Sequence, residues 1–294
     1  MLVNQQNNNG RDDQLNRYFL LTLIAIINWL ILSIVANLFT DNTAAVILIS
    51  TLIMGGFVFL SLTPAAEKIF RFTNGMRPMN PTDENRYKTM LSRVASRCGI
   101  NKEIDIFAVN SNTPNMMALG ERTIAVTTGL MRADLPDEEI EAILAHEIGH
   151  LVNGDSKVLI AATTMNFVGQ LASWFLTVLV AIVGVFSGIA AAFQDRSGLG
   201  VFVGMLISLF LVWTLRLISW VLTQILSLSF HAISRSQEYK ADEFAKQHGY
   251  GNGLAAFLSR IIDFTVTGKD FVSQLFSTHP HPSERIERLM AETA

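Results

Sequence analysis

Four long apolar blocks limit what this chain can fold into. They cover residues 18–40, 44–63, 158–193 and 201–230. A helix of roughly 20 apolar residues is long enough to cross a bilayer, and each block reaches that length. The last two blocks exceed a hydrocarbon core of about 30 Å, so we expect these helices to protrude on one side or to tilt. Another interpretation divides the third block into two short re-entrant pieces, broken near Gly184 and Gly188.

The composition agrees with a membrane protein that carries a soluble part. Half of the residues are hydrophobic and 16% are charged, whereas soluble domains average about 25% charged. The net charge of -3 is small, and no basic stripe suited to nucleic acid is present in the sequence. The single cysteine, Cys98, excludes an intramolecular disulfide and a cysteine-rich metal site, and its amphipathic surroundings predict buried packing.

The basic residues predict the orientation of the spans, because short loops rich in Lys and Arg stay in the cytoplasm. The blocks are flanked on one side by Arg11, Arg17, Lys68, Arg71, Arg77, Lys157, Arg235 and Lys240. The turn between the first two blocks has no basic residue, and the loop between the last two has only Arg196. Residues 18–63 and 158–230 are therefore predicted to form four transmembrane helices, with both termini and the polar segments in the cytoplasm.

The Asn/Gln-rich residues 1–17 are predicted to form a polar, disordered head. No small-residue cleavage site follows the first apolar block, so we expect that block to be an uncleaved anchor.

Two polar segments, residues 64–157 and 231–294, are predicted to form a mainly α-helical (α+β) cytoplasmic domain with a small β-sheet. In the first segment we expect an amphipathic helix that starts after Pro81. Short strands are expected in residues 103–109, in "MMALG" and in "RTIAVTTGLM".

The remaining elements of the polar segments are expected to be helices. The stretch "DLPDEEIEAILAHEIGHLVNG" has Pro136 and acidic residues at its start and Gly154 as its stop. In the second polar segment, helices are expected in "SRSQEYKADEFAKQHG", around residues 254–264 and from Ser283 onward.

The helix that stops at Gly154 contains His146, Glu147 and His150. The two histidines are four residues apart, so they project from one helix face and can both reach a zinc ion at about 2.0–2.1 Å. Glu147 lies about 100° around the helix from His146, where its carboxylate can act as general base on a water molecule. This is the H-E-x-x-H pattern of zinc peptidases, although so short a pattern also arises by chance. Asp155, just after the helix, is expected to cap or position the chain that enters the third span.

A catalytic zinc ion usually has three protein ligands, which leaves its fourth position open. The candidates for the third ligand are the remaining histidines and the carboxylates. "SRSQEYKADEF" offers Glu238 and Asp242, again four residues apart on a predicted helix. Glu238 can bind the metal, and Asp242 can accept a hydrogen bond from a ligand imidazole and fix its tautomer. From spacing alone, a solvated helix face with ordinary surface ion pairs remains an alternative.

Taken together, these motifs resemble the HtpX family, membrane-bound zinc endopeptidases of bacteria related to the eukaryotic CAAX prenyl protease. The resemblance covers nearly the whole chain after the polar head: two spans, "AHEIGHLVNGD", two more spans, "SRSQEYKAD" and "STHP". It implies a gluzincin-like domain with one zinc ion per chain, bound by His146, His150 and Glu238. It further implies that Glu147 is the base and that Asp242 supports a ligand.

The same resemblance implies a multi-pass protein of the bacterial inner membrane that acts in protein quality control. Its partners would be the lipid bilayer and its substrates, namely misfolded or damaged membrane proteins and unfolded polypeptides.

The segment before the zinc helix departs from the family pattern. Where the family often has N-A-F-A, this chain has Asn115, Met116, Met117 and Ala118, so the substrate pocket is expected to differ in detail. We expect this segment to be an edge strand along which an extended substrate binds as an additional strand.

His279 lies in a second departure, since the family's T-H-P-P reads "THPH" here and gains His281 as a neighbour. We expect His279 to lie near the zinc and to donate a hydrogen bond to the oxyanion. The alternative is a structural turn histidine beside a proline. His231 and His248 are not expected to be ligands, because one ends a membrane helix and the other adjoins Gly249.

The sequence therefore favours a membrane-anchored zinc endopeptidase over three other functions. An intramembrane protease would bury the histidine pair within a span, but here the polar stretch "LPDEEIEA" precedes it. A prenyl-protein protease shares these motifs, but the length and the four predicted spans favour the bacterial type. A non-enzymatic membrane scaffold would leave a complete set of ligands and base unused.

Overall fold

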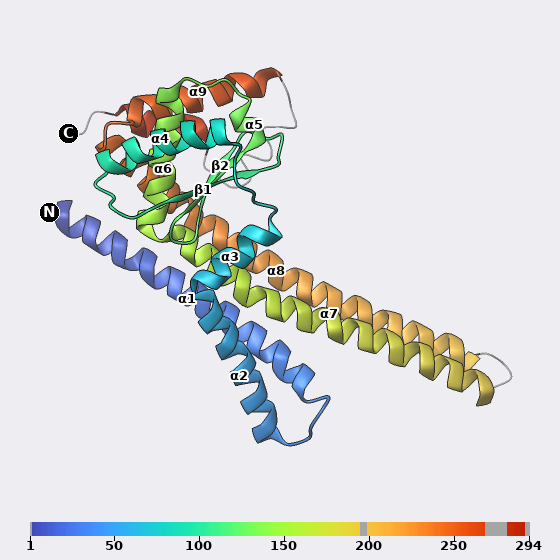
Figure 1. The fold of residues 1–294 in the computed structure, drawn as a ribbon. Helices are drawn as coiled ribbons and strands as arrows, with labels where there is room; N and C mark the ends of the chain where they lie inside the picture. Colours follow the sequence, from blue (N-terminus) through green and yellow to red (C-terminus); the bar gives the residue numbers. More distant parts are fainter. Residues whose placement is uncertain (1, 195–198, 268–280, 292–294) are drawn as a thin grey trace. The chain divides into compact units, whose positions relative to one another are not determined.

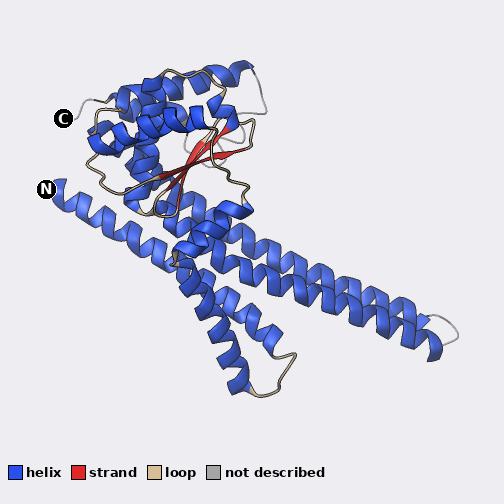
Figure 2. Cartoon of the chain, in the orientation of Figure 1, coloured by secondary structure: helices blue, strands red, loops and turns tan. Residues whose placement is uncertain are grey.

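The structure is a computed structural model, and it describes residues 2–194, 199–267 and 281–291 (Figure 1). The chain divides into two compact units. We call them the polar unit, residues 1–17, 62–161 and 231–294, and the apolar unit, residues 18–61 and 162–230. Helices make up most of the described chain, and the strands all lie in the polar unit (Figure 2). The predicted class, mainly helical with a small sheet, is confirmed.

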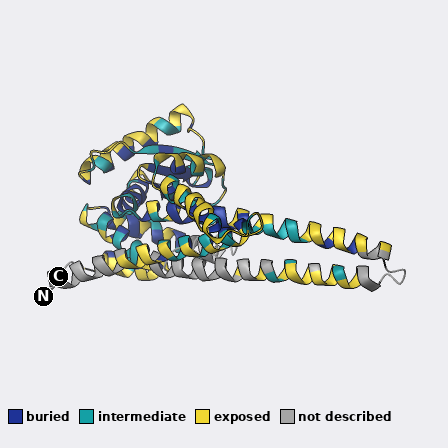
Figure 3. Ribbon diagram, turned by 90° about the horizontal axis from the view of Figure 1, so that it is seen from below, coloured by how far each residue is buried: buried dark blue, intermediate teal, exposed yellow. Residues whose placement is uncertain are grey.

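The apolar unit consists of parts of four helices, namely α1 (Leu2–Ala36), α2 (Thr43–Ser61), α7 (Asp155–Gln194) and α8 (Leu199–Gln247). Three described segments are long and apolar enough to cross a membrane: Leu15–Ala36, Thr43–Ser61 and Asp155–Ala190. At most 28% of the most apolar stretch in each is buried, and many of its apolar residues are exposed (Figure 3). Of the fourth predicted span, the described residues include only a shorter apolar stretch, Phe202–Thr214, so that span stays a prediction.

Helix α1 differs from the sequence prediction at its start. It begins at Leu2 and so includes the polar head that the sequence predicted to be disordered. Starting a helix is the unfavourable step, and a helix already formed by apolar residues can extend without a new nucleus. The composition of the head therefore does not decide its structure on its own.

Helices α7 and α8 are both longer than a membrane span. Helix α7 continues unbroken through Gly184 and Gly188, so the interpretation as two re-entrant pieces is wrong. Its 40 residues extend about 60 Å at 1.5 Å per residue. Helix α8 has 49 residues, and it joins the fourth apolar block and the stretch around Glu238 in one helix, which the sequence prediction had separated.

Within the apolar unit, α1 contacts both α2 and α7. The indole Nε1 of Trp29 donates a hydrogen bond to Thr51 Oγ1 of α2 at 3.1 Å. On α7, Gly169 lies so close to Asn28 that a Cβ atom there would overlap the amide oxygen of Asn28. Small residues at such crossings let membrane helices approach closely, and this one fixes where α1 and α7 meet.

The polar unit contains a three-stranded mixed sheet with the order β1-β3-β2. Strand β1 (Asp105–Val109) runs parallel to the central strand β3 (Thr123–Thr127), and β2 (Met116–Leu119) runs antiparallel to β3 at the other edge. The predicted strand in "RTIAVTTGLM" ends earlier than expected, because Thr127 Oγ1 accepts a hydrogen bond from the Leu130 N–H and starts the short helix α5 (Thr128–Met131).

The helices of the polar unit are α3 (Pro64–Thr73), α4 (Pro81–Arg97), α6 (Asp137–Asn153), α9 (Gly251–Thr267) and α11 (Pro282–Met290), with the last turns of α8. Helix α6 is the central one, since it contacts α4, α9 and β2. The core around it includes Tyr87, Met90, Ile124, Leu144, Ile148 and Leu254, and Cys98 is buried there as predicted.

Both ends of α6 follow the sequence signals. Pro136 directly precedes the helix, and acidic residues fill the first turn, where the helix dipole favours negative charge. The helix ends at Asn153, and Gly154 takes a left-handed conformation with φ of 73°, which glycine adopts at little cost. The H-E-x-x-H pattern therefore lies on the buried second half of a well-delimited helix.

Candidate metal centre

Helix α6 brings His146 and His150 together. Their Nε2 atoms lie 3.2 Å apart, and the two rings meet edge to face. His146 is buried and His150 is half-buried, so water has little access to the two facing nitrogens. The four-residue spacing alone produces this geometry, as the sequence predicted.

Helix α8 places Glu238 opposite the two histidines. Glu238 Oε2 lies 3.4 Å from His146 Nε2, and Oε1 lies 3.3 Å from His150 Nε2. Among the described residues, these three side chains form the one group of histidines, cysteines and acids with the spacing to hold a metal ion. The two alternatives for "SRSQEYKADEF" are thus distinguished, because Glu238 and Asp242 are each 3% exposed and face the histidines, not the solvent.

Two small residues allow α6 and α8 to approach this closely. Gly149 lies between the histidines on α6, and Ala241 lies between Glu238 and Asp242 on α8. A Cβ atom built on Gly149 would be 3.0 Å from the Ala241 Cα and 3.3 Å from its Cβ, which is tighter than ordinary contact. The glycine inside the H-E-x-x-H pattern therefore sets the distance between the two helices.

A carboxylate holds the outer nitrogen of each histidine. His146 Nδ1 lies 2.9 Å from Asp242 Oδ1, and His150 Nδ1 lies 2.9 Å from Asp155 Oδ2. When Nδ1 carries the proton for these hydrogen bonds, Nε2 has its lone pair free for a metal. Both Nε2 atoms face the interior of the cluster, as metal ligation requires.

Arg285 of α11 is a member of this cluster that the sequence prediction missed. It is 6% exposed, and its Nε and Nη2 atoms donate to the two carboxylate oxygens of Asp242 at 2.8 and 2.7 Å. Its Nη1 also lies 3.4 Å from Glu238 Oε2. In the sequence, "SERIERLM" is an ordinary amphipathic helix, and its pattern does not distinguish this arginine from one on the surface.

The hydrogen bonds of the cluster shift several pKa values. Burial lowers the pKa of His146, but hydrogen bonds to Asp242 and Glu238 outweigh it and raise this pKa. In the same way, burial lowers the pKa of His150, while Asp155 and Glu238 raise it well above the ordinary value. Burial raises the pKa of Asp242, but hydrogen bonds from His146 and Arg285 hold it below its usual range. Protons and a metal ion therefore compete for the same imidazole nitrogens.

The donor atoms fit a zinc ion. Two nitrogens bound to one tetrahedral zinc at about 2.0–2.1 Å lie about 3.3 Å apart. The two Nε2 atoms lie 3.2 Å apart, and each lies 3.3–3.4 Å from one of the two Glu238 carboxylate oxygens. Two imidazoles and one carboxylate are also a ligand set found at catalytic zinc sites, where the fourth position stays open.

Glu147 lies beside His146 and His150 on α6 and reaches the edge of the sheet. It is 5% exposed, and its Oε2 accepts a hydrogen bond from the backbone N–H of Ala118 at 2.7 Å. That N–H points away from β3, because the Thr127 N–H bonds to the Asn115 carbonyl and alternate residues of an antiparallel strand face opposite ways. Glu147 and the predicted substrate strand are therefore in direct contact.

The contacts described for His248 and His281 are with residues outside this centre. His279 lies outside the described residues. The His248 ring contacts the Phe244 carbonyl at 2.7 Å, and the His281 side chain contacts Ser283 next to it.

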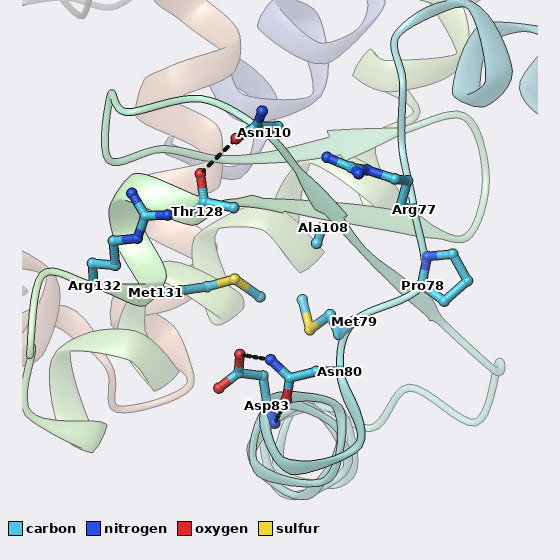
Figure 4. Close-up of a pocket in the computed structure, with 10 residues that line it drawn as sticks. All are labelled: Arg77, Pro78, Met79, Asn80, Asp83, Ala108, Asn110, Thr128, Met131 and Arg132. Carbon is cyan, nitrogen blue, oxygen red and sulfur yellow. Dashed lines mark hydrogen bonds between the residues drawn. The ribbon is translucent and has the colours of Figure 1, made fainter.

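A separate hollow of about 400 Å³ lies at the opposite edge of the sheet (Figure 4). Its wall includes Ala108 of β1 and Thr128 of α5, with Asn110 contacting Thr128 at 3.5 Å. The residues that line it are Arg77, Pro78, Met79, Asn80, Asp83, Ala108, Asn110, Thr128, Met131 and Arg132. None of them belongs to the metal centre, so the hollow is not the candidate site.

Comparison with known families identifies the class of protein. The model of peptidase family M48 matches residues 81–293, which include His146, Glu147, His150, Asp155, Glu238, Asp242 and Arg285. The match covers well over half of the chain, and the chain therefore belongs to peptidase family M48. It is a metallopeptidase, and the apolar helices make it a membrane protein.

Similar proteins include Protease HtpX of Shewanella oneidensis, which is 27% identical over 94% of this chain and 100% of its own length. The Protease HtpX homolog of Bacillus pumilus is 27% identical over 81% of each chain. Among solved structures, the crystal structure of S. mikatae Ste24p matches 90% of this chain and 62% of that chain, with 21% identity and a TM-score of 0.47. The resemblance to the HtpX family is thereby confirmed.

Proposed function

We propose that this chain is a zinc-dependent endopeptidase that hydrolyses misfolded or damaged membrane proteins at the cytoplasmic face of the bacterial inner membrane. The observation that carries the proposal is the buried cluster of His146, His150 and Glu238 with Glu147 beside it. One zinc ion per chain is held by the two Nε2 atoms and the Glu238 carboxylate. When bound, zinc polarises the scissile carbonyl and brings the pKa of the attacking water toward about 7.

Glu147 is the general base. Its carboxylate takes a proton from the attacking water and later delivers that proton to the leaving amine. The Ala118 N–H holds Glu147 Oε2 at 2.7 Å and so limits the positions from which the base can act. Asp242 and Asp155 keep the histidine Nε2 atoms directed at the metal, and burial excludes bulk water from the ligands.

The substrate binds along the free edge of β2. Strand β3 occupies one side of β2, and the carbonyl groups of Met116 and Ala118 face the other side. Strand addition recognises the main chain through hydrogen bonds and requires an extended segment. Such an edge suits unfolded or damaged polypeptides, because folded proteins seldom present an extended segment.

The orientation follows from the basic residues around the apolar blocks and from the four predicted spans. A labelling experiment tests it, with a single cysteine at position 42 or 287 and Cys98, which is buried, changed to serine. A membrane-impermeant reagent applied to intact cells should label Asn42→Cys and leave Glu287→Cys unlabelled. The opposite pattern would place the site outside the cytoplasm.

His279 is included in the proposal as a donor to the oxyanion. His279→Ala should retain zinc and lose much of its activity, whereas full activity in that variant would remove His279 from the mechanism.

The activity itself is tested with purified protein in detergent. The substrate is one membrane protein supplied in a folded form and in a destabilised variant, and the enzymes are the wild type and Glu147→Gln. The proposal expects cleavage of the destabilised form only, lost in Glu147→Gln although zinc is retained. Equal cleavage of both forms would contradict a quality-control role, and cleavage by Glu147→Gln would remove Glu147 as the base.

A further inference from the structure

Arg17 is buried in the polar unit although it begins the first apolar segment. It is 8% exposed, and arginine is seldom buried to this degree unless it is paired. The sequence accounts for it only as a cytoplasmic charge that orients the first span. A charge needed only for orientation would remain in solvent.

The guanidinium of Arg17 contacts two oxygen atoms next to the metal centre, one in an ion pair and one as a hydrogen-bond acceptor. Its Nη2 lies 2.5 Å from Asp155 Oδ1, and its Nη1 donates to the Asn153 carbonyl at 2.9 Å. Asn153 is the last residue of α6, and Asp155 is the first residue of α7. The last carbonyls of a helix lack partners within the helix and favour a positive charge, so Arg17 also closes the end of the zinc helix.

The same carboxylate holds a proposed metal ligand. Asp155 Oδ2 lies 2.9 Å from His150 Nδ1, so one oxygen of Asp155 contacts the histidine and the other contacts Arg17. A carboxylate that accepts a hydrogen bond from a ligand imidazole fixes the orientation of that imidazole. Here the carboxylate is itself held by the planar guanidinium of Arg17, which contacts Asp155 through Nη2 and the Asn153 carbonyl through Nη1. Lysine does not reproduce this two-point contact.

We propose that Arg17 is a positioning residue of the metal centre, acting on His150 through Asp155, so that helix α1 is part of the apparatus that binds the metal. The inference rests on the proposed function, because it presumes that His150 is a zinc ligand. It gives the start of the first membrane helix a role in metal binding besides its role as an anchor.

The test compares zinc affinity among variants of the full-length protein in detergent, measured by competition with a chromogenic chelator. Arg17→Gln removes the guanidinium. Arg17→Lys keeps the positive charge that orients the span in the membrane, but it cannot contact Asp155 and the Asn153 carbonyl through two separate nitrogens. Arg11→Gln is the matched control, since it removes the other basic residue that precedes the span. We expect a loss of about 10-fold or more for both Arg17 variants and none for Arg11→Gln.

A double-mutant cycle tests the route through Asp155. If Arg17 acts through that carboxylate, Arg17→Gln should add little to the loss already caused by Asp155→Asn. If the loss of zinc affinity in the double variant equals the product of the two single losses, the inference is overturned. It is also overturned if Arg17→Lys binds zinc as tightly as the wild type. If Arg17→Gln does not accumulate in the membrane, zinc binding by Arg17→Lys still tests the inference, because that variant keeps the charge that orients the span.

Activity separates this inference from the proposed function. A positioning defect should lower kcat and leave KM for an unfolded substrate nearly unchanged, because the β2 edge is intact. If the wild type binds no zinc and cleaves nothing, the proposed function fails. If the wild type binds zinc and cleaves the substrate, and the Arg17 variants equal it in zinc affinity and in cleavage, only the proposed role of Arg17 fails.

Discussion

Substituting leucine for Arg285 removes a positive side chain that is buried against two carboxylates. Arg285 donates two hydrogen bonds to Asp242, at 2.8 and 2.7 Å, and also lies 3.4 Å from Glu238. Hydrogen bonds to charged groups contribute about 1.5–3 kcal/mol each, and removing one partner of a buried ion pair costs about 3–5 kcal/mol. We therefore expect the free energy of unfolding to fall by about 3–5 kcal/mol.

The same substitution should weaken zinc binding. Hydrogen bonds from His146 and Arg285 hold the pKa of Asp242 below its usual range, and without Arg285 the Asp242 carboxylate is held less firmly against His146 Nδ1. Loss of such a supporting contact lowers metal affinity about 10- to 100-fold. Arg285→Lys should recover part of the loss, because it restores the charge but not the paired hydrogen bonds.

Zinc competition and denaturant unfolding in detergent measure the two effects. Arg288→Leu, on the same helix, is the control, because Arg288 is exposed and its stacking on Tyr239, at 3.8 Å, is worth only about 0.5–1 kcal/mol. If Arg285→Leu bound zinc like the wild type and unfolded like Arg288→Leu, the argument for a buried, supporting arginine would be refuted.

Three further predictions follow from the geometry of the site. Gly149→Val should push α8 away at Ala241 and lower zinc affinity, whereas an unchanged affinity would show that the helix contact is not limiting. Ala118→Pro removes the N–H that holds Glu147 and should lower kcat about 10- to 100-fold with zinc retained, while Ala118→Gly keeps that N–H and most of the activity. Because the pKa values of His146 and His150 are raised, zinc affinity should decrease as the pH is lowered, by about tenfold per pH unit for each proton displaced, and an affinity independent of pH would contradict that competition.

The sequence predicted the parts of the site that depend on local spacing. His146 and His150 meet because they are one turn apart on a helix whose ends carry clear signals. Glu238 and Asp242 share the same spacing, but their spacing alone did not separate a metal site from a solvated face. That distinction depends on the contact between Gly149 and Ala241, which joins residues about ninety positions apart.

Residues that act over long distances in the sequence could not be predicted in this way. Arg285 and Arg288 look alike in an amphipathic helix, yet one is buried beside Asp242 and the other is exposed. Arg17 was interpreted from its place before an apolar block, and its contact with Asp155 appears only in three dimensions. Element types were mostly predicted correctly, but the continuity of α8 was not, because nothing in local composition says that a membrane helix continues into a polar one.

The central claim is that His146, His150 and Glu238 bind one catalytic zinc ion. X-ray absorption at the zinc edge, combined with metal analysis of the purified protein, tests it most directly in the wild type and in Glu238→Ala. We expect one zinc per chain in the wild type, with two imidazole nitrogens and at least one oxygen at about 2.0–2.2 Å, and a weaker, altered site in the variant. A wild type without zinc, or a zinc spectrum that Glu238→Ala leaves unchanged, would contradict it.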